Sequence, residues 1–130
     1  MKFMLMMNAP RGTGDYGVAK WSQEDFKAHI EFMHRFNAEL KAAGELAGAE
    51  GLAPPKEARI VKAGSNGEPL VTDGPFAETK EFLAGYWIVQ CDSAERAYQL
   101  AAKASAAPGP GGAPLNFPIE VREVQSAPKV

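Results

Sequence analysis

Residues 72–92, TDGPFAETKEFLAGYWIVQCD, hold the strongest strand signal of the chain and the turn that leads into it. The apolar run Phe82–Cys91 is rich in aromatic and β-branched side chains, which favour a strand. Asp, Gly and Pro at 73–75 favour a turn, because Asp bonds nearby backbone N–H groups and Pro restricts φ. Charged residues at 78–81 lie between the turn and the strand. We therefore expect a central strand at 82–91 whose entrance has a charged rim.

Apolar periodicity, with start and stop signals on either side, predicts the other elements. Ser22 is a good N-cap for a helix that ends near Ala43, before Gly44. Ser93 caps a second helix at about Ala94–Ala104. The glycine-rich turn GSNG at 64–67 links the two strands of a hairpin. The remaining strands are expected at Lys2–Met7, Glu45–Leu52, Ala58–Ala63, Pro69–Thr72 and Ile119–Val124.

The order of these elements is β, α, β, β-hairpin, β, α, β. Two β-α-β units around a hairpin predict an α+β, ferredoxin-like split βαβ fold with both helices on one face of the sheet. No element is left to cover the other face. The apolar strands at 2–7 and 82–91 therefore predict a homodimer in which two sheets pack face to face.

Length and composition fit one domain over residues 1–130 and exclude several classes of function. The chain has a net charge of −2 and no basic run, which argues against nucleic acid as a partner. No apolar stretch approaches the length of a membrane helix, and Phe3–Met7 is too short for a signal peptide. The one cysteine, Cys91, cannot form an intrachain disulfide. A cytoplasmic setting is expected, with no membrane partner.

Three segments are not expected to form regular structure. Residues 8–20 form a glycine-containing loop. The Pro/Gly-rich stretch SAAPGPGGAPLN at 105–116 predicts a flexible loop, and the tail at 126–130 is expected to fray. The GPGG at 109–112 does not open a helix after a strand, so it is no dinucleotide fingerprint. No phosphate loop or nucleophile elbow occurs, and we expect no cofactor.

His29 and Asp73 are the candidate catalytic residues. His29 lies in an apolar stripe of the first helix, where a polar ring needs a hydrogen-bond partner. Asp73, on the facing sheet, could supply it, and a His–Asp pair suits a general base. The alternatives are a structural histidine bonded to a backbone carbonyl, and a turn in which Asp73 caps backbone groups while Gly74 takes a positive φ. The expected stripe comprises Phe26, His29, Met33, Phe36, Leu40 and Ala43.

A second set of residues could bind a substrate. Lys80 and Glu78 could form a polar rim that selects an anionic or hydroxylated ligand, or simply a solvated edge. Alternation places Tyr86 and Trp87 on opposite sheet faces, so one could line the pocket and the other the dimer interface. His34 is expected at the surface, and no metal site is predicted. The candidate substrate-binding residues are Lys80, Tyr86, Phe76 and Glu78.

Three stretches of the sequence resemble the YCII-related family, in its DGPF-domain subgroup. They are KFMLMM at 2–7, EGLAPP at 50–55 and TDGPFAETKEFLAGYWIV at 72–89, and the similarity extends over roughly residues 1–125. The resemblance implies a ferredoxin-like dimeric α/β barrel in which a His and an Asp meet in a pocket. One member of that family is a dehydrochlorinase that acts on a chlorinated hydroxybenzene-type compound.

Three functions are compatible with these features. The first is a cofactor-free lyase or dehydrochlorinase-like enzyme with His29 as base and Asp73 as its orienting partner. The second is a non-catalytic module that binds a small phenolic or carboxylate ligand in the same pocket, in an accessory or regulatory role. The third is a structural dimer. Fold alone cannot choose between them, because ferredoxin-like scaffolds host many activities.

Overall fold

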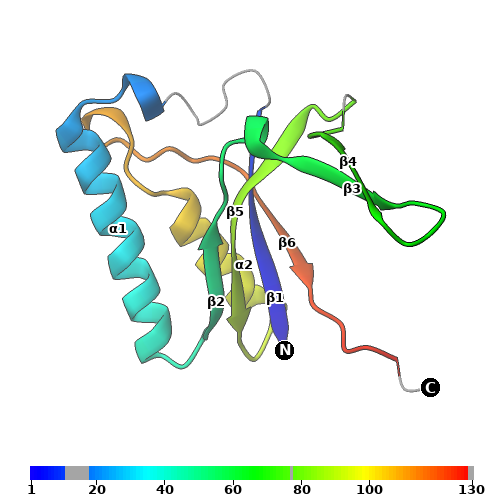
Figure 1. Ribbon diagram of the computed structural model, residues 1–130. Helices are drawn as coiled ribbons and strands as arrows, with labels where there is room; N and C mark the ends of the chain where they lie inside the picture. The colour runs from blue at the N-terminus through cyan, green and yellow to red at the C-terminus, as the bar shows by residue number, and fades with distance from the viewer. Residues whose placement is uncertain (11–17, 77, 129–130) are drawn as a thin grey trace.

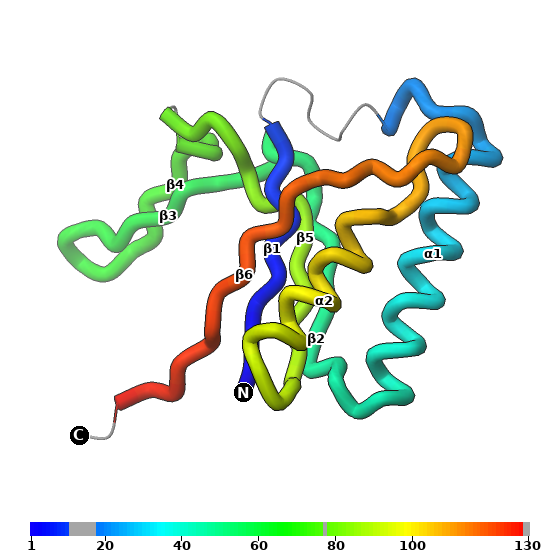
Figure 2. Tube along the Cα trace, turned by 180° about the vertical axis from the view of Figure 1, so that it is seen from behind, coloured from blue at the N-terminus to red at the C-terminus, as the bar shows by residue number. Residues whose placement is uncertain are grey.

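The protein is described by a computed structural model at residues 1–10, 18–76 and 78–128. A four-stranded antiparallel sheet has the order β2-β5-β1-β6. Figures 1 and 2, seen from opposite sides, show α2 behind the sheet and then in front of it. The bounds are β1 Lys2–Pro10, α1 Gln23–Ala42, β2 Leu46–Gly51, β5 Glu81–Gln90, α2 Ala94–Ser105 and β6 Ile119–Glu123.

A separate two-stranded ribbon is inserted between β2 and β5. Its strands are β3, Arg59–Ala63, and β4, Pro69–Asp73, and we call residues 59–73 the β3–β4 arm. The arm projects beyond the sheet on the side away from α1 (Figures 1 and 2). Three short 3-10 turns complete the described structure: η1 Val18–Lys20, η2 Pro55–Glu57 and η3 Pro110–Gly112.

The architecture is α+β, with two helices and an antiparallel sheet, as the sequence predicts. With the arm set aside, the element order is βαββαβ, which is the split βαβ order. The four-stranded sheet is open within one chain. A closed barrel would therefore require a second chain.

Local signals explain where the helices begin and end. The Ser22 hydroxyl accepts a hydrogen bond from the Asp25 backbone N–H at 3.1 Å, and Ser93 caps α2 through the Arg96 N–H at 3.2 Å. Each cap satisfies a backbone donor that has no partner within the helix. Gly44 follows α1 with φ 71°, the left-handed conformation that ends many helices.

The core lies between the helices and one face of the sheet. Trp87 of β5 packs edge-on against Phe36 of α1, with ring centroids 5.6 Å apart, and its indole N–H donates to Asn37 Oδ1 at 2.8 Å. An aromatic pair of this geometry adds to the stabilisation from area burial alone. The other buried members include Phe3, Leu5, Leu40, Val89, Cys91, Ala97, Leu100 and Ala104.

The opposite sheet face is not covered by a helix among the described residues. We call it the open sheet face, and its centre consists of Met4, Met6, Tyr86 and Ile88. Met4 is the register partner of Ile88, and Met6 that of Tyr86, so these side chains form two adjacent cross-strand pairs. The two residues therefore lie on opposite faces, as predicted: Trp87 faces the helices and Tyr86 faces the open side.

Several predicted boundaries and local conformations are wrong. β1 continues to Pro10, three residues beyond the predicted end, because a bulge after Met7 lets it stay paired with β5. Residues 11–17 of the predicted loop lie outside the described residues. Gly74 is not among the positive-φ glycines. Glycine is favoured at position 74 because an added Cβ would lie 3.2 Å from the Ala58 backbone, which is closer than most Cβ contacts.

Two further expectations need correction. Phe26 is 45% exposed, because the core contacts of α1 begin at Phe32, six residues further along the helix. The Pro/Gly-rich stretch at 105–116 contains a 3-10 turn and a bridge between Pro108 and Pro114. Its glycines and prolines therefore favour one specific turn here. Of the predicted frayed tail, residues 126–128 have no regular structure and 129–130 lie outside the described residues.

Removing the hydrogen-bond acceptor of the Trp87 indole should lower the stability of the fold. We expect Asn37→Leu to lower the free energy of unfolding by about 1–3 kcal/mol, because the buried N–H loses its partner. In a Trp87→Phe background, which has no such donor, the same change should cost clearly less. Urea denaturation of the four proteins of this cycle measures the difference. An equal cost in both backgrounds would contradict the assignment.

An ion pair ties α2 to the segment before β2. Arg96 Nε and Nη2 donate to the two Glu45 carboxylate oxygens at 2.9 and 2.8 Å. The hydrogen bonds from Arg96 hold the pKa of Glu45 below its ordinary value. The stabilisation from this pair is present above the unfolded pKa of Glu45, about 4.3. It is lost as the pH falls through the lower folded pKa.

We therefore expect Arg96→Gln to destabilise the protein near neutral pH and to match the wild type more closely below the folded pKa of Glu45. Chemical denaturation at a series of pH values measures the gap. The control is Glu45→Gln, which should show the same trend because it removes the other partner. A gap that stays constant from neutral to acidic pH would exclude this ion pair as the cause.

Candidate functional site

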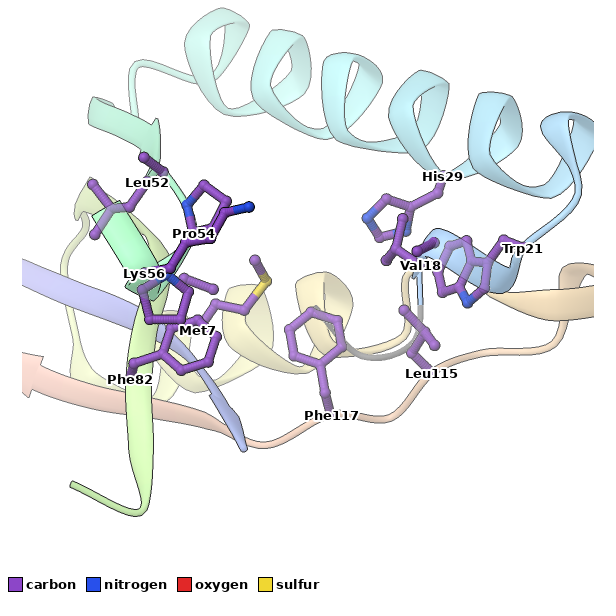
Figure 3. A pocket seen from close by; sticks show the side chains of 14 residues that line it. Met7, Val18, Trp21, His29, Leu52, Pro54, Lys56, Phe82, Leu115 and Phe117 are labelled. Atoms are coloured by element: carbon purple, nitrogen blue, oxygen red, sulfur yellow. The ribbon is translucent and has the colours of Figure 1, made fainter. Parts of the chain in front are cut away.

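A largely apolar cleft of about 600 Å³ lies between the first half of α1 and one end of the sheet. We call it the main cleft. One wall comes from residues 52–56 before β3 and from Phe82 of β5, and the other from residues around Trp21 and Leu115. Figure 3 shows His29 extending from α1 into the space between these walls. Further lining residues are Met7, Val18, Ala84 and Phe117.

His29 has a defined position at this cleft. Its Nδ1 lies 3.0 Å from the Pro108 carbonyl oxygen, and its ring meets the Trp21 ring edge-on at a centroid distance of 5.4 Å. A carbonyl oxygen can only accept a hydrogen bond, so Nδ1–H is the donor. In the neutral ring Nε2 then carries the lone pair. The geometry prepares Nε2 to accept a proton or a hydrogen bond.

The partner of His29 comes from the Pro/Gly-rich stretch, which its own hydrogen bonds hold in place. The Gly109 N–H donates to Ala113 O at 2.8 Å, and the Leu115 N–H to Ala107 O at 2.9 Å. An added Cβ at Gly109 would lie 2.5 Å from Leu115 Cδ2, so a larger residue there would displace the Leu115 side chain from the cleft wall. This loop therefore sets both the acceptor for His29 and one apolar wall of the cleft.

A second, smaller cleft of about 350 Å³ adjoins the first. Met7 and His29 line both, and the second continues between α1 and β2, where Met33 and Ala49 contribute. His29 therefore stands where two hollows meet. A ligand longer than a single ring could extend from the main cleft past the imidazole.

The ionisable side chains among the described residues of the main cleft are those of His29 and Lys56. The other lining residues are apolar, with Trp21, Phe82 and Phe117 supplying aromatic surface. Pockets that bind small molecules commonly combine apolar walls with a few placed polar groups. The arrangement suits a molecule with an apolar, ring-sized body and one polar group directed at Nε2.

The structure does not bring His29 and Asp73 together within one chain. Asp73 is at the end of β4, its side chain is 96% exposed, and its carboxylate lies 3.8 Å from Arg59 Nε. His29 is bonded to a backbone carbonyl, which is the structural alternative that the sequence left open. The orienting partner of the imidazole in this chain is Pro108.

The predicted substrate-binding residues lie mostly outside the main cleft. Glu78 and Lys80 are exposed before β5, and Phe76 is 64% exposed at the base of the arm. Tyr86 borders the second cleft through its strand, while its side chain belongs to the open sheet face. Sequence reasoning missed the residues that do line the main cleft. These include Trp21, Leu115, Phe117 and Met7, together with Pro108 as partner of His29.

Three further observations concern other predictions made from the sequence. His34 is exposed on α1, where the helical spacing places it. Among the described residues there is no group of three His, Cys, Asp or Glu side chains that could hold a metal ion. No helix in the described part of the chain is long and apolar enough to cross a membrane.

Comparison with known proteins gives one family and one curated relative. Residues 1–111 match the YCII-related domain, so the match includes every strand but β6. An uncharacterized protein of Rhizobium meliloti (strain 1021) is 34% identical over 84 residues, which are 65% of this chain and 67% of the relative.

Gly109 provides a test of the loop that positions His29. We expect Gly109→Ala to lower the free energy of unfolding by about 1–3 kcal/mol, because the new methyl group overlaps Leu115. Gly51→Ala is the matched control, since a Cβ there meets nothing within 4 Å. Thermal and urea denaturation compare the two. Equal stability of both variants would contradict this prediction and show that Leu115 moves aside at little cost.

Proposed function

We propose, from the premise that this chain belongs to the YCII-related domain family, that it binds a small aromatic molecule in the main cleft, with His29 as the group that accepts the ligand's hydrogen bond. The observation that carries the proposal is the hydrogen bond from His29 Nδ1–H to the Pro108 carbonyl. It leaves the basic nitrogen of the neutral ring to the ligand.

The chemistry of the cleft favours a phenolic ligand over a carboxylate. A phenol has an apolar ring for the walls formed by Trp21, Phe82 and Phe117, and an O–H that can donate to Nε2. An ionised carboxylate has only acceptors, so it could pair with Lys56 but could not donate a hydrogen bond to Nε2. A volume of about 600 Å³ is within the range of small-molecule sites.

The same geometry supports a catalytic version of the function. A base held in one tautomer beside a bound phenol could abstract its proton or an adjacent one, as in a cofactor-free lyase or dehydrochlorinase-like reaction. Assignment to the DGPF subgroup also stays a prediction. The catalytic role of Asp73 and the ligand contacts of Lys80, Tyr86, Phe76 and Glu78 stay predictions, as does a cytoplasmic location.

A homodimer is part of the proposal. The open sheet face presents Met4, Met6, Tyr86 and Ile88, which are apolar or aromatic and are not covered by a helix in the described chain. Two such faces packed together would bury them and complete a dimeric α/β barrel.

Binding can be tested with pairs of phenols and their methyl ethers, which keep the ring but lose the O–H donor. We expect a phenol to raise the melting temperature of the wild type by several degrees at saturating concentration, and the ether to do so much less. His29→Gln should clearly reduce the phenol effect, because it replaces the basic nitrogen with an amide oxygen, which is a weaker acceptor and is placed differently. His34→Gln, on the exposed side of the same helix, is the matched control.

The outcome that contradicts this assignment is a phenol shift that is as large in His29→Gln as in the wild type. Catalysis is then judged separately, by following the consumption of chlorinated phenols with each variant. Turnover that disappears in His29→Gln and persists in His34→Gln indicates an enzyme. Binding without turnover indicates the non-catalytic module.

A further inference from the structure

The β3–β4 arm exposes several apolar side chains to solvent. Val61 and Val71 are register partners and are 61% and 57% exposed, and Leu70 is 47% exposed. An isolated two-stranded ribbon is at best marginally stable in water, because it has no third layer to bury its side chains. The arm therefore needs a surface to pack against.

The surface area of the whole chain also indicates that part of its surface is covered by a partner. The chain exposes 8859 Å² for a mass of 13.9 kDa. A compact monomer of that mass would expose about 6,700 Å². The excess is about 2,200 Å², and the projecting arm and the extended residues 124–128 contribute to it (Figure 1). An obligate dimer hides about 1,000–2,500 Å² on each subunit, a range that includes this excess.

The chain itself carries a matching surface. The open sheet face has an apolar centre of Met4, Met6, Tyr86 and Ile88, and its β6 margin carries Glu120 and Arg122. The arm has a similar composition, with Val61 and Val71 beside the Arg59–Asp73 ion pair. Both surfaces combine apolar side chains with one acidic and one basic residue. A second copy can satisfy both contacts through one two-fold axis.

We propose that the β3–β4 arm is a dimerisation arm, which packs with its Val61–Val71 face on the β6 margin of the open sheet face of a second copy of this chain, beside the contact between the two sheets. The inference deepens the homodimer of the proposed function and rests on it. It adds that the interface extends beyond the sheets, because each arm reaches across to the other subunit.

The arm also connects the interface to the main cleft. Pro54, Pro55 and Lys56, which precede the arm, line the cleft, and Phe82 lines it shortly after the arm ends. The Gly74 N–H donates to Ala58 O at 2.9 Å and closes the base of the arm. Docking of the arm therefore fixes one wall of the cleft. A monomer would have the imidazole in place but this wall less restrained.

The test is the oligomeric state of an arm variant, measured by sedimentation equilibrium over a range of concentrations. Val61→Lys/Val71→Lys places two charges in the proposed contact, and we expect the dimer dissociation constant to rise about 100-fold or more. Ala38→Lys/Ala102→Lys adds the same charge to exposed positions of α1 and α2 and should leave it unchanged.

A second measurement covers the case in which the arm variant misfolds. In a Cys91→Ser background, Val71→Cys adds one thiol to the arm and Ala38→Cys adds one to α1. We expect alkylation of the arm thiol to slow several-fold as the protein concentration rises through the dissociation constant. The rate at position 38 should not change with concentration.

The outcomes separate the proposals. A dimer whose affinity is unaffected by the arm lysines, with equal alkylation at all concentrations, overturns the arm contact and leaves the sheet-to-sheet dimer standing. A wild type that is monomeric at all concentrations overturns both. Binding of phenols at His29 is scored independently by thermal shift, so its failure leaves the test of the arm intact.

Discussion

The alternation of β5 is the constraint on which the rest of the structure depends. Trp87 and Val89 point to the helices and are buried, while Tyr86 and Ile88 point to the open face. Because side chains of a strand alternate strictly, one choice of face fixes the other. The Trp87 indole is satisfied by Asn37 of α1, which places that helix over the sheet. The core, the cleft beside His29 and the apolar open face all follow from this placement.

The orientation of the His29 ring depends on a segment that lies far from α1 in the sequence. His29 belongs to α1, yet its hydrogen-bond acceptor is Pro108, which is 79 residues further along the chain. The bond constrains the tautomer as well as the ring orientation, and a carboxylate is not needed for either purpose. A carbonyl supplies no charge to stabilise an imidazolium, however. The arrangement therefore suits an acceptor of hydrogen bonds better than a strong base acting without further help.

In the proposed dimer, assembly and ligand binding would be coupled, because the arm and one wall of the cleft are joined at residues 54–56 and Phe82. The chain leaves the cleft wall at Lys56, forms the arm and returns to the wall at Phe82. A contact that orders the arm also restricts these residues, whereas one that forms only between the sheets would not. In the proposed dimer, the position of one cleft wall would therefore depend on the contact between the inserted ribbon and the second copy.

The sequence by itself determined the elements and their order. Ser22, Gly44 and Ser93 bound the helices because caps are local, and the apolar run at 82–91 identified the central strand because alternation is local. Only the tertiary structure decided which side chains meet. The sequence singled out His29 as a polar residue in a largely apolar helix face, but the partner of His29 depends on how a Pro/Gly-rich stretch folds back. Asp73 faces Arg59 across the arm because strand register, not residue type, sets that contact. Contacts between distant segments arise from packing, which no local pattern encodes.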